Sequence, residues 1–160
     1  MAASITNLLL LTQFQVAENP GSQPAGVTLL STFNDLDQLL QLTPTTAPPV
    51  SMFGVYKTTI SSGGYTIDAT SLQGTNGSLN ATGKKLVAIS VKNPTASVGD
   101  VNIATGAVNG YAIPQPVKVK PGGFALVYHA AALAAIGSST KTLDVSGTSG
   151  DTPEIGLVLG

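Results

Sequence analysis

This chain of 160 residues has very little charge and lacks several of the residue types that usually carry out chemistry. It contains no arginine, no cysteine and no tryptophan, and a single histidine. Only 9% of its residues are charged, against about 25% in typical soluble domains. Such a surface cannot steer a charged substrate by its field, and it has no guanidinium to grip a phosphate. It can be buried against other proteins at little desolvation cost. The composition therefore indicates an assembly protein rather than an enzyme.

The missing residue types also narrow the range of partners. Without cysteine the chain has no disulfide framework and no thiolate metal site. Its seven lysines are scattered, apart from Lys84 and Lys85, so we expect no direct binding of nucleic acid. The apolar run at 8–11 is too short to cross a bilayer. The first 18 residues also lack the lysine or arginine that a secretory signal would have. We therefore predict neither a membrane segment nor a targeting segment.

Residues 1–51 form the first predicted unit, an N-terminal arm with one short helix. We place this helix within 33–42, because four apolar residues have the spacing of one helical face and Pro44 follows them. So short a helix is not stable alone, and it must dock on the body of the protein or on a neighbour. The segment 8–16 is predicted to be a strand or an extended arm. The residues on the helical face are Phe33, Leu36, Leu39 and Leu40.

Residues 52–160 form the second predicted unit, which is mainly β. Apolar residues recur at every second position, and clusters of Gly, Pro and Asn separate the runs at intervals of about ten residues. Seven or eight such strands predict an antiparallel β-sandwich or jelly roll. The segment 130–136 contains good helix formers, but we expect a crossover loop there. The alternating residues are Tyr65, Ile67 and Ala69; Val87, Ile89 and Val91; Val101 and Ile103; Val117 and Val119; Phe124, Leu126 and Tyr128; Leu143 and Val145; and Ile155, Leu157 and Leu159.

No catalytic residue is predicted. His129 follows a strand, and the chain offers no cysteine or arginine to partner it and no serine in a nucleophile elbow, so we interpret it as structural. A glycosidase needs two carboxylates that face each other across a cleft. Asp68 and Asp144 occupy outward positions of strands, where exposure to solvent explains them better than a catalytic role does. The other acids are Glu18, Asp35, Asp37, Asp100, Asp151 and Glu154.

No metal-ligating or cofactor-binding residue is predicted either. Asp100, Asp151 and Glu154 lie at loop ends, but the chain has no calcium-loop motif. The glycine-rich stretch 147–150 lacks the lysine of a phosphate loop, and the glycosylation motif that begins at Asn80 is a weak signal. The tyrosines are too few and too widely spaced to stack sugars or bases. They are Tyr56, Tyr65, Tyr111 and Tyr128.

The order of strands and turns from about residue 64 to the C-terminus resembles small jelly-roll proteins encoded in tailed-bacteriophage genomes. The resemblance rests on turn and strand patterns rather than on catalytic signatures, and it leaves the first 60 residues unaccounted for. The segments that carry it are 68–72 (DATSL), 74–77 (GTNG), 86–94, 101–104, 109–111, 117–123 and 141–147.

The resemblance implies an auxiliary virion protein, namely a capsid decoration (cement) protein that binds and stabilises the assembled head shell. Its partners would then be the major capsid protein and further copies of itself, most plausibly in a homotrimer. It would be assembled in the host cytoplasm and lie on the capsid surface of the virion. Two other readings stay open: a tail, fibre or baseplate component, and a carbohydrate-binding adhesin-type sandwich.

A cement protein with this composition would bind through broad uncharged contacts and through an arm that orders on docking. Exposed ion pairs contribute about 0.2–1 kcal/mol each and weaken with salt. We therefore expect binding to the shell to survive high ionic strength. Deletion of residues 1–50 is expected to abolish or greatly weaken binding and to leave the β-domain folded.

Overall fold

A computed structural model describes residues 8–12, 15–18, 29–32, 38–43, 45–74, 77–129 and 131–160. Within these ranges the protein is mainly β, and its one helical element is a single 3-10 turn, η1 (Ala69–Ser71). The strands are β1 (Leu8–Thr12), β2 (Gln15–Glu18), β3 (Leu29–Thr32), β4 (Gln38–Leu42), β5 (Met52–Lys57), β6 (Gly64–Asp68), β7 (Leu72–Gly74), β8 (Gly77–Leu79), β9 (Leu86–Lys92), β10 (Val101–Thr105), β11 (Val117–Val119), β12 (Phe124–Tyr128), β13 (Thr142–Ser146) and β14 (Glu154–Leu159).

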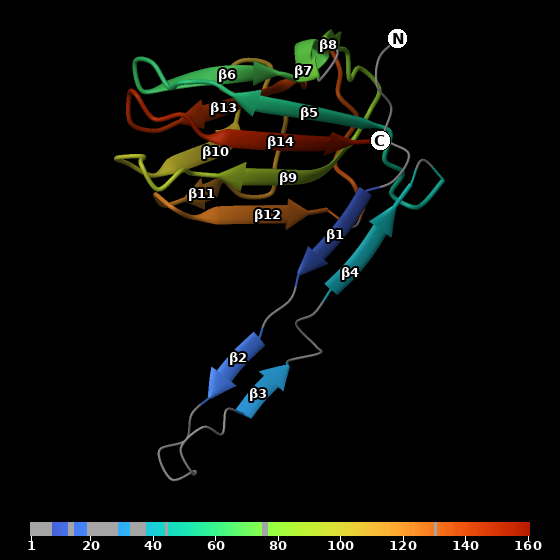
Figure 1. Cartoon of the computed structure of the whole chain (residues 1–160). Coiled ribbons are helices and arrows are strands. Elements are labelled where there is room, and N and C mark those ends of the chain that lie inside the picture. The colour runs from blue at the N-terminus through green and yellow to red at the C-terminus, as the bar shows by residue number, and fades with distance from the viewer. Residues whose placement is uncertain are drawn as a thin grey trace.

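Two antiparallel four-stranded sheets make up the body, one with strand order β12-β9-β14-β5 and the other β11-β10-β13-β6. Figure 1 shows them as two layers. Their eight strands pair as a folded double ribbon, in which β5 pairs with β14, β6 with β13, β9 with β12 and β10 with β11. Two further pairings, β9 with β14 and β10 with β13, join the folded ribbon into the sheets. The mainly β, antiparallel expectation is confirmed.

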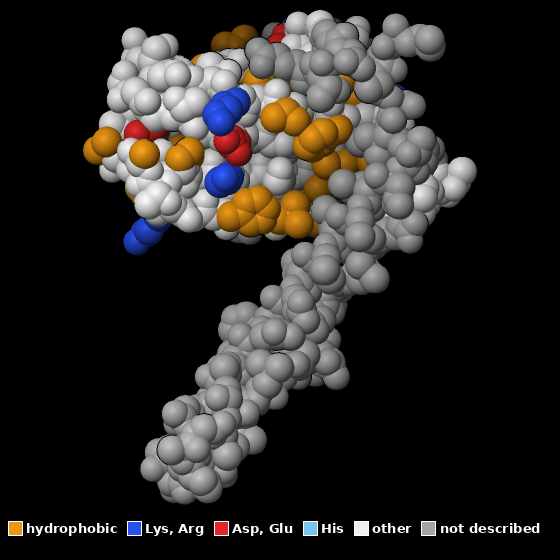
Figure 2. All heavy atoms as spheres, in the orientation of Figure 1, with side chains coloured by type: hydrophobic (Ala, Val, Ile, Leu, Met, Phe, Trp, Pro, Cys, Tyr) orange, Lys and Arg blue, Asp and Glu red, His pale blue; other side chains and the backbone are white. Residues whose placement is uncertain are grey.

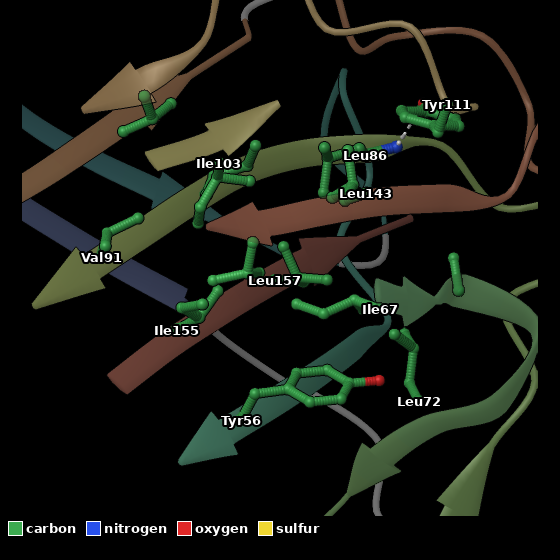
Figure 3. Close-up of a cluster of buried hydrophobic side chains, with 14 of the residues drawn as sticks. Tyr56, Ile67, Leu72, Leu86, Val91, Ile103, Tyr111, Leu143, Ile155 and Leu157 are labelled. Atoms are coloured by element: carbon green, nitrogen blue, oxygen red, sulfur yellow. Dashed lines mark hydrogen bonds between the residues drawn. The ribbon is translucent and has the colours of Figure 1, made fainter. Parts of the chain in front are cut away.

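The main core lies between the two sheets. Ile89, Val91 and Leu157 from one sheet and Ile103 and Leu143 from the other belong to one buried cluster (Figure 3). Full burial of such a side chain contributes about 1.5–3 kcal/mol. Alternation along the strands supplies these residues, as the sequence predicted.

A second, smaller cluster lies on the outer face of the sheet β12-β9-β14-β5. Leu42 and Val50, which precede β5, pack there against Val87, Ala88 and Val158. The start of β9 is therefore buried on both faces. The segment that leads into β5 is thus packed against the outer face of the sheet that contains β5.

The remaining described strands form short two-stranded ladders. β1 pairs with β4 and β2 pairs with β3, and neither ladder joins a four-stranded sheet (Figure 1). β7 and β8, which come between β6 and β9 in the sequence, form a third ladder. The strand expected within 8–16 is confirmed for β1 and for the start of β2.

The helix predicted within 33–42 is wrong for 38–42, because β4 occupies those residues. Leu39 and Leu40 pair with Leu11 and Leu10 of β1. The helical spacing of the leucines was coincidental, since pairing with a distant strand supplies the hydrogen bonds that a lone short helix cannot retain. Residues 33–37, the rest of that predicted helix, lie outside the described residues.

The crossover loop expected at 130–136 is supported where the structure describes it, at 131–136. The amides of Leu133 and Ile136 donate to the carbonyls of Leu86 and Lys84, which fixes the loop against the start of β9. No helix in the described part of the chain has the length and apolar character needed to cross a membrane. The domain boundary at residue 51 stays a prediction.

Tyr111 fastens this loop to the core. Its side chain is 2% exposed, its hydroxyl donates to the carbonyl of Ala134, and the amide of Leu86 donates to the same hydroxyl at 3.2 Å (Figure 3). Tyr65 differs, because its buried hydroxyl has no hydrogen-bond partner among the residues that the structure describes. Burial, with a smaller contribution from Tyr56, raises the pKa of Tyr65 to about 12.

Removal of the hydroxyl is expected to change the free energy of unfolding differently at the two tyrosines. Tyr111→Phe leaves a buried amide and a carbonyl unpaired, and should lower the free energy of unfolding by about 1–3 kcal/mol. Tyr65→Phe removes an unpaired polar group and should change it by less than about 0.5 kcal/mol or raise it. Urea unfolding of both variants checks this. Equal losses in the two variants would contradict the assigned role of Tyr111.

Candidate interaction surface

The outer face of the sheet β12-β9-β14-β5 has a hollow that is open to a partner. The strand register places Phe124, Lys92, Glu154 and Lys57 in one row across this face. Glu154 lies between the two lysines, 2.8 Å from the Nζ of Lys57 and 3.9 Å from that of Lys92. The hydrogen bond from Lys57 and the positive charges of both lysines lower the pKa of Glu154.

Two further rows on this face are uncharged, with small residues on the central strands and larger ones at the edges. The register gives these rows as Leu126, Ser90, Gly156 and Val55, and as Tyr128, Ala88, Val158 and Phe53. Figure 2 views this face, with hydrophobic side chains on both sides of a pale strip and a charged group at one end. The small side chains therefore leave a depression in the middle of this face, with larger apolar side chains along its edges.

The depression is a shallow hollow of about 220 Å³. Its lining includes Ser90 and Gly156 on the central strands, the apolar side chains of Phe53, Val55 and Phe124, and the charged pair Lys92 and Glu154. The three apolar side chains are 39%, 42% and 65% exposed. A Cβ on Gly156 would lie 2.5 Å from the Ser90 hydroxyl oxygen and 3.0 Å from the Phe53 ring, so the absence of a side chain there keeps the hollow open.

Sequence reasoning did not find this hollow. Phe124, Leu126 and Tyr128 do share a face, as expected, but it is the outer one, whereas Ala125 and Val127 pack against the main core. A strand that is apolar on both faces is a signal that both faces are covered. The pairing of Ser90 with Gly156 depends on the register of strands far apart in the sequence, and no local pattern reveals it.

His129 directly follows β12. Its amide donates to the carbonyl of Val87, and its buried Nε2 atom has no hydrogen-bond partner among the described residues. Burial lowers the pKa of His129. The structural interpretation of His129 stays a prediction.

Asp68 and Asp144 lie on the outer face of neighbouring strands, β6 and β13. Asp144 accepts hydrogen bonds from the Thr66 hydroxyl at 2.7 Å and from the Ala107 amide at 2.8 Å. Asp68 lies 2.6 Å from the Nζ of Lys141 and also accepts from the amide and hydroxyl of Thr70. Each carboxylate is thus committed to its own partners on one surface, rather than facing the other across a cleft.

The acids at the loop ends fasten loops and strands. Asp151 is 4% exposed and accepts from the amides of Val98 and Gly99, at 2.8 and 3.0 Å. Asn93, fully buried, donates to the carbonyls of Gly99 and Val119. In the part of the chain that the structure describes, His, Asp and Glu form no group of three or more that could hold a metal ion.

The remaining motifs take ordinary structural roles. Asp100 forms an ion pair with Lys118 at 3.1 Å. The glycine-rich stretch 147–150 is a turn whose Gly150 has a φ of +100°, in the region that favours glycine. Asn80 accepts hydrogen bonds from the amide and hydroxyl of Thr82.

Comparisons with family models, curated proteins and solved structures found no significant match to this chain.

The ion pair of Asp68 with Lys141 predicts a pH dependence of stability. Partial burial would raise the pKa of Asp68, but the hydrogen bonds from Lys141 and Thr70 outweigh it and lower the pKa. A lowered pKa stabilises the fold above the pKa of the unfolded state, and this gain is lost as the pH falls through the folded value.

We therefore expect Asp68→Asn to be less stable than the wild type at pH 7, by no more than about 1 kcal/mol because the pair is partly exposed. The difference should close as the pH falls below about 4. Urea unfolding at several pH values measures it, with Lys141→Met as a second variant that should show the same trend. A difference that stays constant with pH would show that the charge is not responsible.

Proposed function

We propose that this protein is a structural virion protein, a capsid decoration (cement) protein that binds and stabilises an assembled head shell. Its body is proposed to be a β-sandwich of the jelly-roll kind. The major capsid protein and further copies of the chain, in a homotrimer, are the proposed partners, with neither nucleic acid nor a membrane bound directly. The proposed location is the capsid surface, after assembly in the host cytoplasm.

The strand pairing supports the proposed fold. A jelly roll has eight strands in two sheets, and viral capsid domains are among its examples. Numbered along the chain, the eight body strands pair first with eighth, second with seventh, third with sixth and fourth with fifth. Folding such a ribbon over itself gives two four-stranded sheets of the observed order.

The observation that carries the functional proposal is the outer sheet face with its hollow, two of whose three rows are uncharged, in a chain that also places the β1–β4 ladder outside both sheets. A decoration protein occupies many equivalent sites and stabilises the shell by mass action on the bound state. Broad contacts with few charges suit this task, because little desolvation cost opposes them. The described acids, which serve ion pairs and backbone amides, support a structural role rather than an enzymatic one.

A shell-binding assay tests the proposal. Purified protein is mixed with undecorated shells at low and high salt, and occupancy is measured. Because Leu42 and Val50 are buried in the body, the truncation stops before them and removes residues 1–40. We expect wild-type occupancy to persist at high salt, and the truncated protein to lose most of its binding while its circular dichroism stays that of a β protein.

Loss of wild-type binding at high salt, or full binding by the truncated protein, would contradict the proposed mechanism. Immunogold electron microscopy of virions tests the location separately. Labelling of the head supports a cement protein, whereas labelling confined to the tail would replace it by a tail or baseplate component.

A further inference from the structure

We propose that the outer-face hollow of one molecule binds the β1–β4 ribbon of a second copy of this chain, so that copies associate by exchanging their N-terminal ribbons. The hollow is the one lined by Phe53, Val55, Ser90, Phe124 and Gly156, with Lys92 and Glu154 in its charged row. This inference goes beyond shell binding, and it is tested without any shell. It rests on the homotrimer of the proposed function, so its failure would remove self-association in solution but leave the proposed shell binding standing, and loss of shell binding would leave the exchange of ribbons standing.

The ribbon has leucines at both sets of alternating positions. In its register, Leu8 pairs with Leu42 and Leu10 with Leu40, which places these four residues on one face. The other face receives Leu9 together with the pair Leu11 and Leu39. An isolated two-stranded ribbon is marginally stable at best in water, and exposed apolar faces need a partner. Both faces of this ribbon therefore require cover.

The position of Leu42 decides which face of the ribbon we assign to the second copy. Leu42 is 2% exposed and packs with Val50 and Val158 on the outer face of its own sheet. Leu42 thus fixes the end of β4 against the body. The face opposite that of Leu42, with Leu9, Leu11 and Leu39, is the one we assign to the second copy.

The hollow is a depression flanked by apolar side chains, and it lies on the same sheet face as an existing apolar cluster. Its middle lacks bulk because Gly156 has no side chain and Ser90 has a small one, and exposed apolar side chains belong to its lining. The cluster of Leu42, Val50 and Val158 lies on the same sheet face, so an added leucine-rich ribbon would extend an existing apolar contact.

Charge does not oppose this contact. Neither β1 nor β4 contains a charged residue, so the ribbon can be buried without stripping water from a charge of its own. The charged residues of the hollow, Lys92 and Glu154, lie in one row and form an ion pair with each other. An uncharged, leucine-rich ribbon therefore fits the apolar part of the hollow, which favours a second copy of this chain as the occupant.

The contact is between unlike surfaces, since a ribbon binds a hollow. Such head-to-tail contacts close into rings when the rotation between copies permits. The exchange therefore explains how a chain with so few charges could form a closed trimer.

The first test measures the oligomeric state of the full chain by sedimentation velocity at micromolar concentration. We expect wild type to be oligomeric, and the double variant Val55→Asp/Phe124→Asp to be monomeric. The matched control, Val98→Asp/Val108→Asp, changes two residues that are 82% and 73% exposed, in loops away from the hollow, and should leave the oligomer intact. Circular dichroism and urea unfolding check that each variant is folded.

A second test avoids disruptive substitutions by using the absence of cysteine from the chain. Chains with Leu11→Cys are refolded together with size-tagged chains carrying Ser90→Cys, and then oxidised. We expect a mixed disulfide dimer on a non-reducing gel. Leu10→Cys, on the opposite face of the ribbon, should give little cross-linking with Ser90→Cys.

The outcomes separate the possible occupants of the hollow. A monomeric wild type, or a hollow variant that associates as the wild type does, would overturn the proposal. When both cysteines are in one chain, cross-linking confined to single chains would show that the ribbon covers its own hollow and would also overturn it. Mixed dimers at Leu11 but not at Leu10, together with loss of the oligomer in the hollow variant alone, would support it.

Discussion

The fold of this protein depends on how the apolar faces of its sheets are kept from water. The inner faces of the two four-stranded sheets cover each other and form the main core. Among the described residues, Leu42 and Val50 cover one end of the outer face of β12-β9-β14-β5. Around its hollow it stays exposed, and the leucine-rich β1–β4 ribbon lies outside both sheets. In a chain with 9% charged residues, burial of apolar surface is the main means of association. The proposed shell binding and the proposed ribbon exchange both follow from this constraint.

The few polar groups mainly fasten loops. Asp151 and Asn93, both buried, bind backbone groups of the loop between β9 and β10, and Asn93 also reaches the end of β11. Tyr111 joins the crossover loop to the amide of Leu86. Ion pairs such as that of Asp68 with Lys141 lie at the surface and add little. This division of roles yields a rigid body whose outer surface offers few charges to a partner, which suits the proposed decoration protein.

Alternation predicted the body strands β6 and β9 to β14 because each has one face in the main core, as Ile89 and Val91 do in β9. The remaining body strand, β5, was not among the predicted alternating segments. Alternation could not identify the outer face of β12, where Phe124 is exposed while the smaller Ala125 packs inward. The leucines of β4 suggested a helix because their spacing fits both structures, and only pairing with β1 decides between them. The hollow escaped detection because Ser90 and Gly156 are 66 positions apart in the sequence and become neighbours through strand register. Local sequence patterns thus predict individual strands, whereas a surface formed by strands that are distant in the sequence can be identified only from the tertiary structure.

The central claim is that the β1–β4 ribbon is covered by another molecule. Hydrogen exchange followed by mass spectrometry tests this most directly, because a marginal ribbon opens readily unless it is packed. The account predicts slow exchange of amides in 8–12 and 38–42 in the assembled wild type. Exchange of the same amides should be fast in the Val55→Asp/Phe124→Asp variant, whereas the amides of β9 and β14 should stay protected in both proteins. Equally fast exchange of the ribbon amides in the two proteins would contradict the account.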